Sequence, residues 1–222
     1  MKKPLLLAVT AVLSIQLHAQ DSTGTAEKKQ VYFATASELI FSWGDVEAKP
    51  LEPSPIVRFS CFLHLEEQLN YDFSDKVGFY TGVSLRNVGF INDLNDTVKL
   101  KQRVYTLGIP VALKIGNMDG TSLRVGAEGE LALNYKQKVY VNGEKTKTNI
   151  WFSDRTNLFL PSVFAEIKFS QGLYLKFKYY LTDFLVEDKQ KINVAGVVYV
   201  PTKSQLMYAA IGVVLKDKKY KK

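Results

Sequence analysis

The chain has 222 residues, a formal net charge of +7, 46% hydrophobic residues and a single cysteine. One cysteine excludes an intramolecular disulfide, and the length suits one all-β domain without a second unit. This hydrophobic content occurs in soluble and in membrane proteins alike, so composition leaves the class open and the patterning must decide it.

The first 20 residues have the parts of a secretory signal peptide. Lys2 and Lys3 form a charged start, residues 5–15 an apolar run, and His18-Ala19-Gln20 a processing site. The run is too short to cross about 30 Å of hydrocarbon as a helix. Cys61 lies too far along the chain to carry a lipid at the cleavage point. We predict a signal peptide over residues 1–20 and a polar leader over residues 21–30.

The rest of the chain alternates apolar with polar or small residues, which is the pattern of a transmembrane β-barrel. Residues 105–115 show it most clearly, with Tyr, Leu, Ile, Val, Leu and Ile at the odd positions. We predict an eight-stranded antiparallel up-and-down transmembrane barrel over residues 31–215. Its strands are expected at residues 31–43, 56–71, 77–90, 98–115, 122–136, 158–169, 173–182 and 206–215.

The connections are alternately short and long. Residues 72–76, 116–121 and 170–172 are short, residues 44–55, 137–157 and 183–205 are long, and 91–97 is intermediate. Outer-membrane barrels have short periplasmic turns and long outer loops, so we expect both chain ends in the periplasm. Asn142-Gly143 predicts a two-residue hairpin turn at a loop tip. Residues 192–200 indicate either a hairpin arm above the membrane or a barrel of ten strands.

Two prolines fall inside predicted strands, Pro110 and Pro161. Proline cannot donate to a ladder of backbone hydrogen bonds. Each is therefore expected to mark a bulge or a missing bond.

The strands agree on which face meets lipid: Val57, Phe59, Cys61, Leu63, Leu65, Leu123, Val125, Leu131, Leu133, Leu173, Leu175, Phe177 and Tyr179. The opposite face carries the charges: Arg58, Ser60, His64, Glu66, Arg86, Lys114, Arg124, Glu128, Glu130, Glu166, Lys168, Lys176 and Lys178. A charge facing lipid at the bilayer midplane is unfavourable, so this face must point into the lumen. Side chains fill the interior of eight strands, and we predict a packed polar plug rather than an open pore.

Residues 105–114 read Tyr-x-Leu-x-Ile-Pro-x-x-Leu-Lys, after Gly-Val-Ser-Leu at 82–85 and before Gly-Leu-Tyr-Leu at 172–175. This arrangement resembles the outer-membrane β-barrel families of Bacteroidetes, which include the PorT-like proteins. The resemblance implies a small barrel in the outer membrane of a Gram-negative cell, and for the PorT-like branch an association with type IX secretion. One departure is the lysine-rich tail at residues 216–222, where many outer-membrane proteins end on an aromatic residue.

The residues do not indicate an enzyme. Ser60, His64 and Glu66 share a face, but four residues of a regular strand separate Ser60 from His64 by about 13 Å. Ser84 on a neighbouring strand would have to serve as the nucleophile instead. One histidine in the mature chain and an outward cysteine predict no metal and no cofactor.

Partners are expected at the membrane. Lys99, Lys101 and Arg103 lie on the lipid-facing side at the outer end of their strand, where lipopolysaccharide phosphates are found, or else on a solvated strand extension. The remaining lysines are dispersed, so we predict no nucleic-acid binding. The function is expected in outer-membrane structure, or in contacts that residues 139–152 and 187–203 make with other envelope proteins, in a secretion or surface assembly. The alternatives are a soluble periplasmic lipocalin-like barrel for an apolar ligand and a lipid-modifying outer-membrane enzyme centred on His64.

Overall fold

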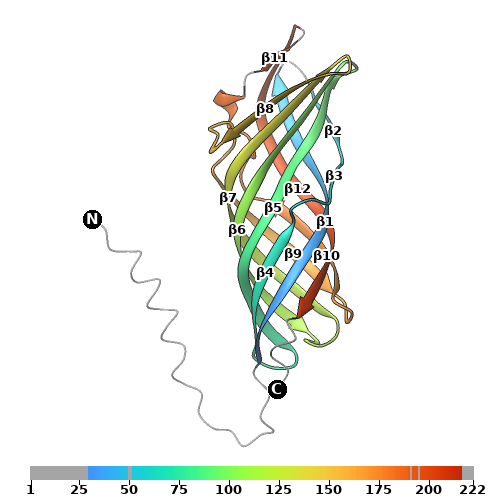
Figure 1. Ribbon diagram of the computed structural model, residues 1–222, viewed down its shortest axis with the longest axis vertical. Helices are drawn as coiled ribbons and strands as arrows, with labels where there is room; N and C mark the ends of the chain where they lie inside the picture. Colours follow the sequence, from blue (N-terminus) through green and yellow to red (C-terminus); the bar gives the residue numbers. More distant parts are fainter. Residues whose placement is uncertain (1–29, 50–51, 191, 195, 217–222) are drawn as a thin grey trace, which may run out of the picture.

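The computed structural model describes residues 30–49, 52–190, 192–194 and 196–216. The predicted signal peptide, all of the leader except Gln30 and all of the tail except Lys216 lie outside the described residues. Figure 1 shows a tall barrel, with the start of β1 and the end of β12 at its lower end.

Antiparallel strands and one 3-10 helix, η2 (Glu187–Lys189), make up the named elements. The strands are β1 (Gln30–Lys49), β2 (Ser54–Ile56), β3 (Arg58–Ser60), β4 (Leu65–Asp72), β5 (Val77–Asn95), β6 (Val98–Gly116), β7 (Ser122–Val141), β8 (Glu144–Trp151), β9 (Phe159–Lys168), β10 (Leu173–Tyr180), β11 (Ile192–Val194) and β12 (Val197–Lys216). No helix among the described residues is long and apolar enough to cross a membrane.

The strands form a closed ring. β1 pairs with β4, and the order continues through β5, β6, β7, β9, β10 and β12, which pairs back onto β1 from Ala34↔Lys216 to Lys49↔Val200. The ring has eight positions because β2 and β3 continue that of β4, β8 continues that of β9, and β11 is a short arm on β12. The predicted eight-stranded up-and-down barrel is therefore confirmed, and the ten-stranded alternative is wrong.

Several strands extend further at the upper end than predicted. β1 continues to Lys49, β7 to Val141, and β12 begins at Val197, so most of the expected long loops are paired ribbon. The reason is that the pattern is inverted: in these extensions most buried positions are apolar, as at Val46 and Val139, while most outer positions are polar or charged. The end of the apolar-outside pattern is therefore not the end of the strand.

The hairpin predictions are confirmed at both places. Asn142 and Gly143 form the tight turn between β7 and β8, each with positive φ. Residues 192–200 contain the β11–β12 hairpin, which pairs Ile192 with Tyr199.

The prolines interrupt backbone pairing in different ways. Along the β5–β6 ladder, pairing stops between Thr81↔Val111 and Ser84↔Gly108, which leaves Pro110 in a gap. Pro161 lies just beyond Tyr180↔Ser162, where the β9–β10 ladder ends, and its carbonyl accepts a hydrogen bond from the Leu181 amide. In an antiparallel strand the N–H and the C=O of one residue face the same neighbouring strand. The N–H that Pro161 lacks would therefore face the β10 side beyond the last ladder pair, so its absence removes no hydrogen bond within the ladder.

The prediction of one continuous strand over residues 56–71 is wrong. It is broken by a bend over residues 61–64, where Leu63 has a φ of 64°. Leu63 is therefore half-buried in the bend, while Val57, Phe59, Cys61 and Leu65 are exposed as expected.

The β1–β12 seam can be tested by a disulfide. Ser37 and Val213 are directly paired and both exposed. In a Cys61→Ser background, S37C with V213C should oxidise readily, because opposed Cα atoms in an antiparallel ladder are about 4.5–5.5 Å apart, within disulfide range. Non-reducing gel mobility reports the bond. S37C with L215C, displaced by two residues, is the control, and equal oxidation of both pairs would contradict this register.

Candidate functional site

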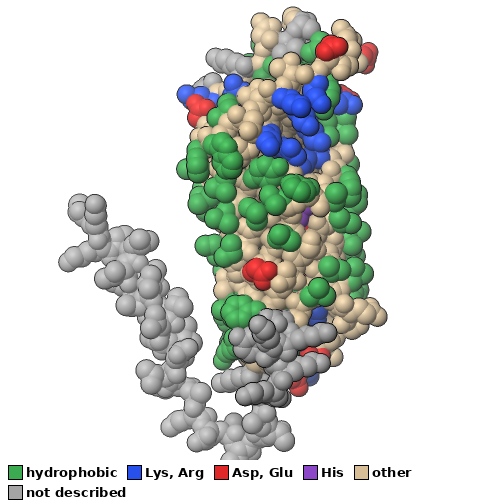
Figure 2. Space-filling model, viewed as in Figure 1, with side chains coloured by type: hydrophobic (Ala, Val, Ile, Leu, Met, Phe, Trp, Pro, Cys, Tyr) green, Lys and Arg blue, Asp and Glu red, His purple; other side chains and the backbone are tan. Residues whose placement is uncertain are grey.

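The outer wall of the barrel is divided into an apolar band below and a polar zone above. On β6 the outward residues from Ile115 up to Tyr105 are all apolar or aromatic, and from Arg103 upward they are basic. Ten residue steps on this strand, at about 3.3 Å each and a tilt of about 40°, give a band about 25 Å tall. Figure 2 shows hydrophobic side chains spread over the wall below a cluster of basic ones.

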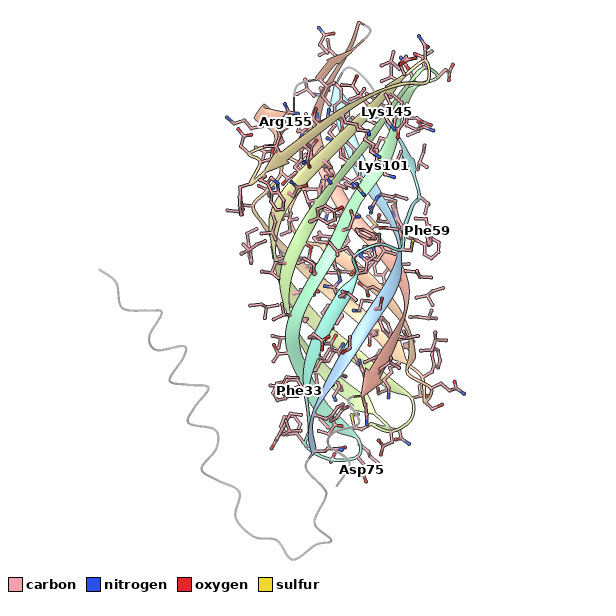
Figure 3. The ribbon with its side chains drawn as sticks, viewed as in Figure 1. Phe33, Phe59, Asp75, Lys101, Lys145 and Arg155 are labelled. Carbon is pink, nitrogen blue, oxygen red and sulfur yellow. The ribbon has the colours of Figure 1, made fainter. Side chains whose placement is uncertain are left out.

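Aromatic side chains lie near both edges of this band. At the lower edge the rings of Tyr71, Phe73 and Phe79 are 4.9–5.8 Å apart between centroids, and Phe33 lies at the same end (Figure 3). Higher on the wall Phe41 packs on Phe59 at 5.2 Å. Such girdles are typical of strands that pass through two membrane–water interfaces.

One charged residue interrupts the outer face. Glu67 is exposed between Leu65 and Leu69 on β4, and its carboxylate accepts a hydrogen bond of 3.0 Å from the Thr35 hydroxyl. This hydroxyl supplies one polar partner within an otherwise apolar surface.

The lumen contains the charged residues that the alternation placed there. Arg58, His64, Glu66, Arg86, Lys114, Arg124, Glu128, Glu130, Glu166, Lys168, Lys176 and Lys178 are each 5% exposed or less. Glu38 and Asp72 are also buried, which the sequence reasoning missed. Among the described residues the interior thus holds seven basic and six acidic side chains, so the plug is nearly neutral.

Arg86 is the centre of this network. Its guanidinium reaches carboxylates from three other strands: Glu38 on β1 at 2.7 Å, Glu66 on β4, and Glu128 on β7. Glu130 lies 3.7 Å away. Four carboxylates around one cation would repel one another, so further cations are required.

Two lysines of β10 supply that charge. Lys176 lies 3.3 Å from both Glu38 and Glu166, and Lys178 lies 2.7 Å from Glu128 and 2.5 Å from Glu130. Arg124 completes the set at 2.9 Å from Glu166. Buried charges are stable only when paired in this manner. Pairs such as Arg86–Glu38 and Lys178–Glu128 link strands that are not neighbours in the ring.

The upper lumen is filled differently, by apolar side chains. Ile40, Val88, Phe90, Leu100, Val104, Leu160, Phe184 and Leu206 belong to one buried cluster with Tyr180, Tyr199 and Tyr208. The segments on both sides of η2 turn inward, so that Phe184 before it is fully buried and the amide of buried Gln190 after it donates to the Tyr135 hydroxyl at 3.0 Å. The charged plug and this core together leave the lumenal side chains out of contact with solvent.

Small residues in the lumen allow large ones to pack. A Cβ added at Gly212 would lie 2.2 Å from the Tyr174 ring, and one at Gly44 would lie 2.5 Å from the Phe90 ring. This explains why the sequence of β1 gave a weak pattern: its inward face mixes the small residues Ala34, Ala36 and Gly44 with the large Glu38 and Ile40.

The bend in the second strand position changes the expected geometry of His64. The β4–β5 ladder ends at Leu65↔Leu85 and β2 begins pairing at Ile56↔Ile91, so side chains fill the interval. The Arg58 guanidinium donates to the Asn87 carbonyl at 3.1 Å and to its amide oxygen at 2.9 Å. Buried backbone groups that lack a strand partner are thus partly satisfied by side chains.

Ser60 and His64 are in contact, and the expected separation of about 13 Å for a regular strand is wrong here. His64 Nε2 lies 2.8 Å from Ser60 Oγ because the bend folds the chain back. The Asn87 backbone N–H points to His64 Nδ1 at 3.4 Å, which makes Nδ1 an acceptor and assigns the proton to Nε2. His64 therefore donates to Ser60, the reverse of what a general base needs. Glu66 is held by Arg86 and Gln68 instead.

The basic stripe of β6 lies on the outer face above the apolar band. Lys101 and Arg103 are half-buried, and Lys99 is exposed and 3.5 Å from Asp93. The described residues contain no group of histidine, cysteine or acidic side chains that could hold a metal ion.

The sequence matches no family model and no curated protein. Among solved structures, the chain is similar to Neisserial surface protein A, with a TM-score of 0.44, 11% identity, and coverage of 86% of this chain and 100% of that one. It is also similar to Ail, the attachment invasion locus protein of Yersinia pestis, with a TM-score of 0.38, 11% identity, and coverage of 83% of this chain and 99% of that one. For the outer membrane protein OprG from Pseudomonas aeruginosa the TM-score is 0.32 and the identity 12%, with coverage of 84% of this chain and 94% of that one. These scores are too low to carry an argument, and the fold rests on the strand pairing above.

Removing the central cation tests the lumenal network. Arg86→Met should lower the free energy of unfolding by about 3–5 kcal/mol, because it leaves buried carboxylates without their shared partner. Urea titration of the protein in lipid vesicles, followed by tryptophan fluorescence, measures the change. Lys203→Met removes an exposed ion pair to Asp45 and Glu47 and should have no measurable effect. Equal stability of the two variants would contradict the role of Arg86.

Proposed function

We propose that this chain is an integral outer-membrane protein of a Gram-negative envelope, with its short turns in the periplasm and its long hairpins at the cell surface. The observation that carries the proposal is the apolar band on the outside of a closed barrel whose inside is charged. In a soluble barrel this arrangement would expose the apolar band to water. In a bilayer the apolar band contacts hydrocarbon and the polar zone above it contacts water and lipid headgroups. Within the apolar band, ring closure also leaves the wall without free strand edges, apart from the side-chain-filled interval beside Arg58.

The protein acts through its surface and not as a channel. The buried charged plug and the apolar core above it support this part of the proposal, because a water-filled path would expose lumenal side chains. The β7–β8 and β11–β12 hairpins stand at the end opposite the start of β1 and the end of β12 (Figure 1) and are the contact segments. Of residues 139–152, Val139 is buried and Val141 packs against the core, while the turn and most of β8 are exposed. Of residues 187–203, Gln190 and Tyr199 are buried within the barrel mouth, so contacts involve the outer part of that hairpin.

The finer assignment, to the Bacteroidetes families that include the PorT-like proteins, is part of this proposal. It rests on the resemblance at residues 105–114 and 172–175. In that setting the hairpins would contact other envelope proteins of a secretion or surface assembly, while the barrel anchors them in the outer membrane.

A different observation counts against each of the two alternatives. The lipocalin-like hypothesis requires an apolar lumen in the lower barrel and a polar wall. The lower lumen is charged instead, and the wall around it is apolar. The lipid-modifying enzyme requires His64 to accept a proton from a serine, and the contact with Asn87 favours the other tautomer. We therefore propose a non-enzymatic role.

A charge on the wall tests the membrane placement. Val111→Arg, in the middle of the apolar band, should lower the free energy of unfolding in vesicles by about 2–4 kcal/mol, since arginine near the midplane faces hydrocarbon. Val198→Arg, at a similarly exposed valine on the upper hairpin, should change it little. Urea unfolding of both variants, with fractionation and heat-modifiable gel mobility of the native protein, gives the measurement. Equal effects at the two sites would argue for a water-exposed wall.

The non-enzymatic role is tested in the producing cell. His64→Ala should leave the outer-membrane lipid composition, measured by mass spectrometry, identical to that of cells carrying the wild-type chain. A lipid modification that disappears in the variant and returns with the wild-type chain would establish the enzyme reading instead. Gel mobility before and after boiling verifies that the variant barrel is folded.

A further inference from the structure

The upper outer wall carries a basic patch assembled from three adjacent strands. It consists of Lys101 and Arg103 on β6, Lys136 and Lys138 on β7, and Lys145 and Lys147 on β8. Figure 2 shows basic side chains gathered on this part of the wall, and Figure 3 labels Lys101 and Lys145 there. Only the β6 part of the patch is visible as a stripe in the sequence.

The strand register places like charges directly opposite one another. Arg103 is paired with Lys136, and Lys101 is paired with Lys138, which is paired in turn with Lys147. Directly opposed like charges destabilise a sheet. The pKa of Lys138 is lowered by burial and then by the positive charges of Arg103, Lys145, Lys147 and Lys136.

No acidic side chain of the described residues forms an ion pair with any of these six groups. The contrast is the β1–β12 side of the barrel at the same end, where Lys203 lies 3.2 Å from Asp45 and 3.0 Å from Glu47. There the protein neutralises its own charge. On the patch it does not, so an external anion is the missing partner.

The position of the patch identifies the source of that anion. Along β6 the outward residues change from Leu107 through Tyr105 to Arg103 without a gap, so the cations begin where the apolar band ends. Tyr105 lies between two of them, with the Arg103 guanidinium 5.8 Å and the Lys136 ammonium 5.2 Å from its ring centroid. Lipid phosphates lie at this height, directly above the hydrocarbon.

We propose that this patch binds the phosphate groups of lipopolysaccharide in the outer leaflet, with Arg103 and Lys136 nearest the hydrocarbon and the remaining lysines above them. The inference rests on the proposed membrane placement and orientation. It extends the sequence-derived stripe by four lysines of β7 and β8. Lys99 is outside the patch, because Asp93 already pairs with it.

The test compares two variants with the same change in net charge. The patch variant is K101Q/R103Q/K136Q/K138Q, and the control is K49Q/K76Q/K203Q/K216Q, which removes lysines elsewhere. Each protein is first inserted into phosphatidylcholine nanodiscs, and its folding is verified by heat-modifiable gel mobility. Binding of bisphosphorylated lipid A, of dephosphorylated lipid A and of phosphatidylglycerol is then measured by native mass spectrometry.

We expect the wild-type and control proteins to bind bisphosphorylated lipid A, and the patch variant to bind it at least about tenfold more weakly, since each basic residue near an anionic surface contributes about 1 kcal/mol. Dephosphorylated lipid A and phosphatidylglycerol should bind weakly to all three. Equal loss in the control, or retained binding of dephosphorylated lipid A, would overturn the patch. Preference for phosphatidylglycerol would overturn the choice of lipopolysaccharide.

The two proposals fail in distinguishable ways. A wild-type chain that stays soluble without detergent and does not enter nanodiscs would refute the membrane placement itself. A chain that inserts normally but binds lipid A equally well with and without the patch would refute only the phosphate site.

Discussion

The pairing of β1 with β12 is the contact on which the rest of the structure depends. It joins the first and last strands along nearly their whole length, and so turns a sheet into a barrel. Closure provides partners for the edge amides and carbonyls, which have none in hydrocarbon. It also creates an inside and an outside, and thereby fixes the medium that each residue of the alternating pattern must meet.

The interior that closure creates is filled in two layers with different physics. In the lower layer Arg86 and the two lysines of β10 balance carboxylates from β1, β4, β7 and β9, so strands that are not neighbours in the ring are tied together. In the upper layer Phe90, Leu160 and Phe184 form an ordinary apolar core. The layers change where the outer wall changes from apolar to charged. Above the band the barrel is therefore organised as a water-soluble protein is, and within the band it is inverted.

The wall has one irregular place, and side chains maintain it. Between β2 and β4 the ladder to β5 is interrupted, and Arg58 and His64 bind Asn87 where a strand would have paired. This single interruption brings Ser60 to His64 and creates the resemblance to a catalytic pair. The proton assignment is the reverse of what a general base needs, and each of the two side chains has a further partner at the bend, Arg58 for Ser60 and Asn87 for His64.

The sequence by itself determined the fold class and the side on which most residues lie. Alternation has a period of two residues, and a charge is so unfavourable in lipid that Lys114 or Glu166 can point only inward. It did not determine the upper extensions, because the alternation changes phase there, nor the bend at residues 61–64, which no turn motif announces. Only the tertiary structure decided which charges meet, because Arg86 and its carboxylates are 20 to 48 residues apart in sequence and are brought together by ring closure. It also decided that lysines of three strands form one patch, since register, which the sequence does not display, sets which residues are neighbours.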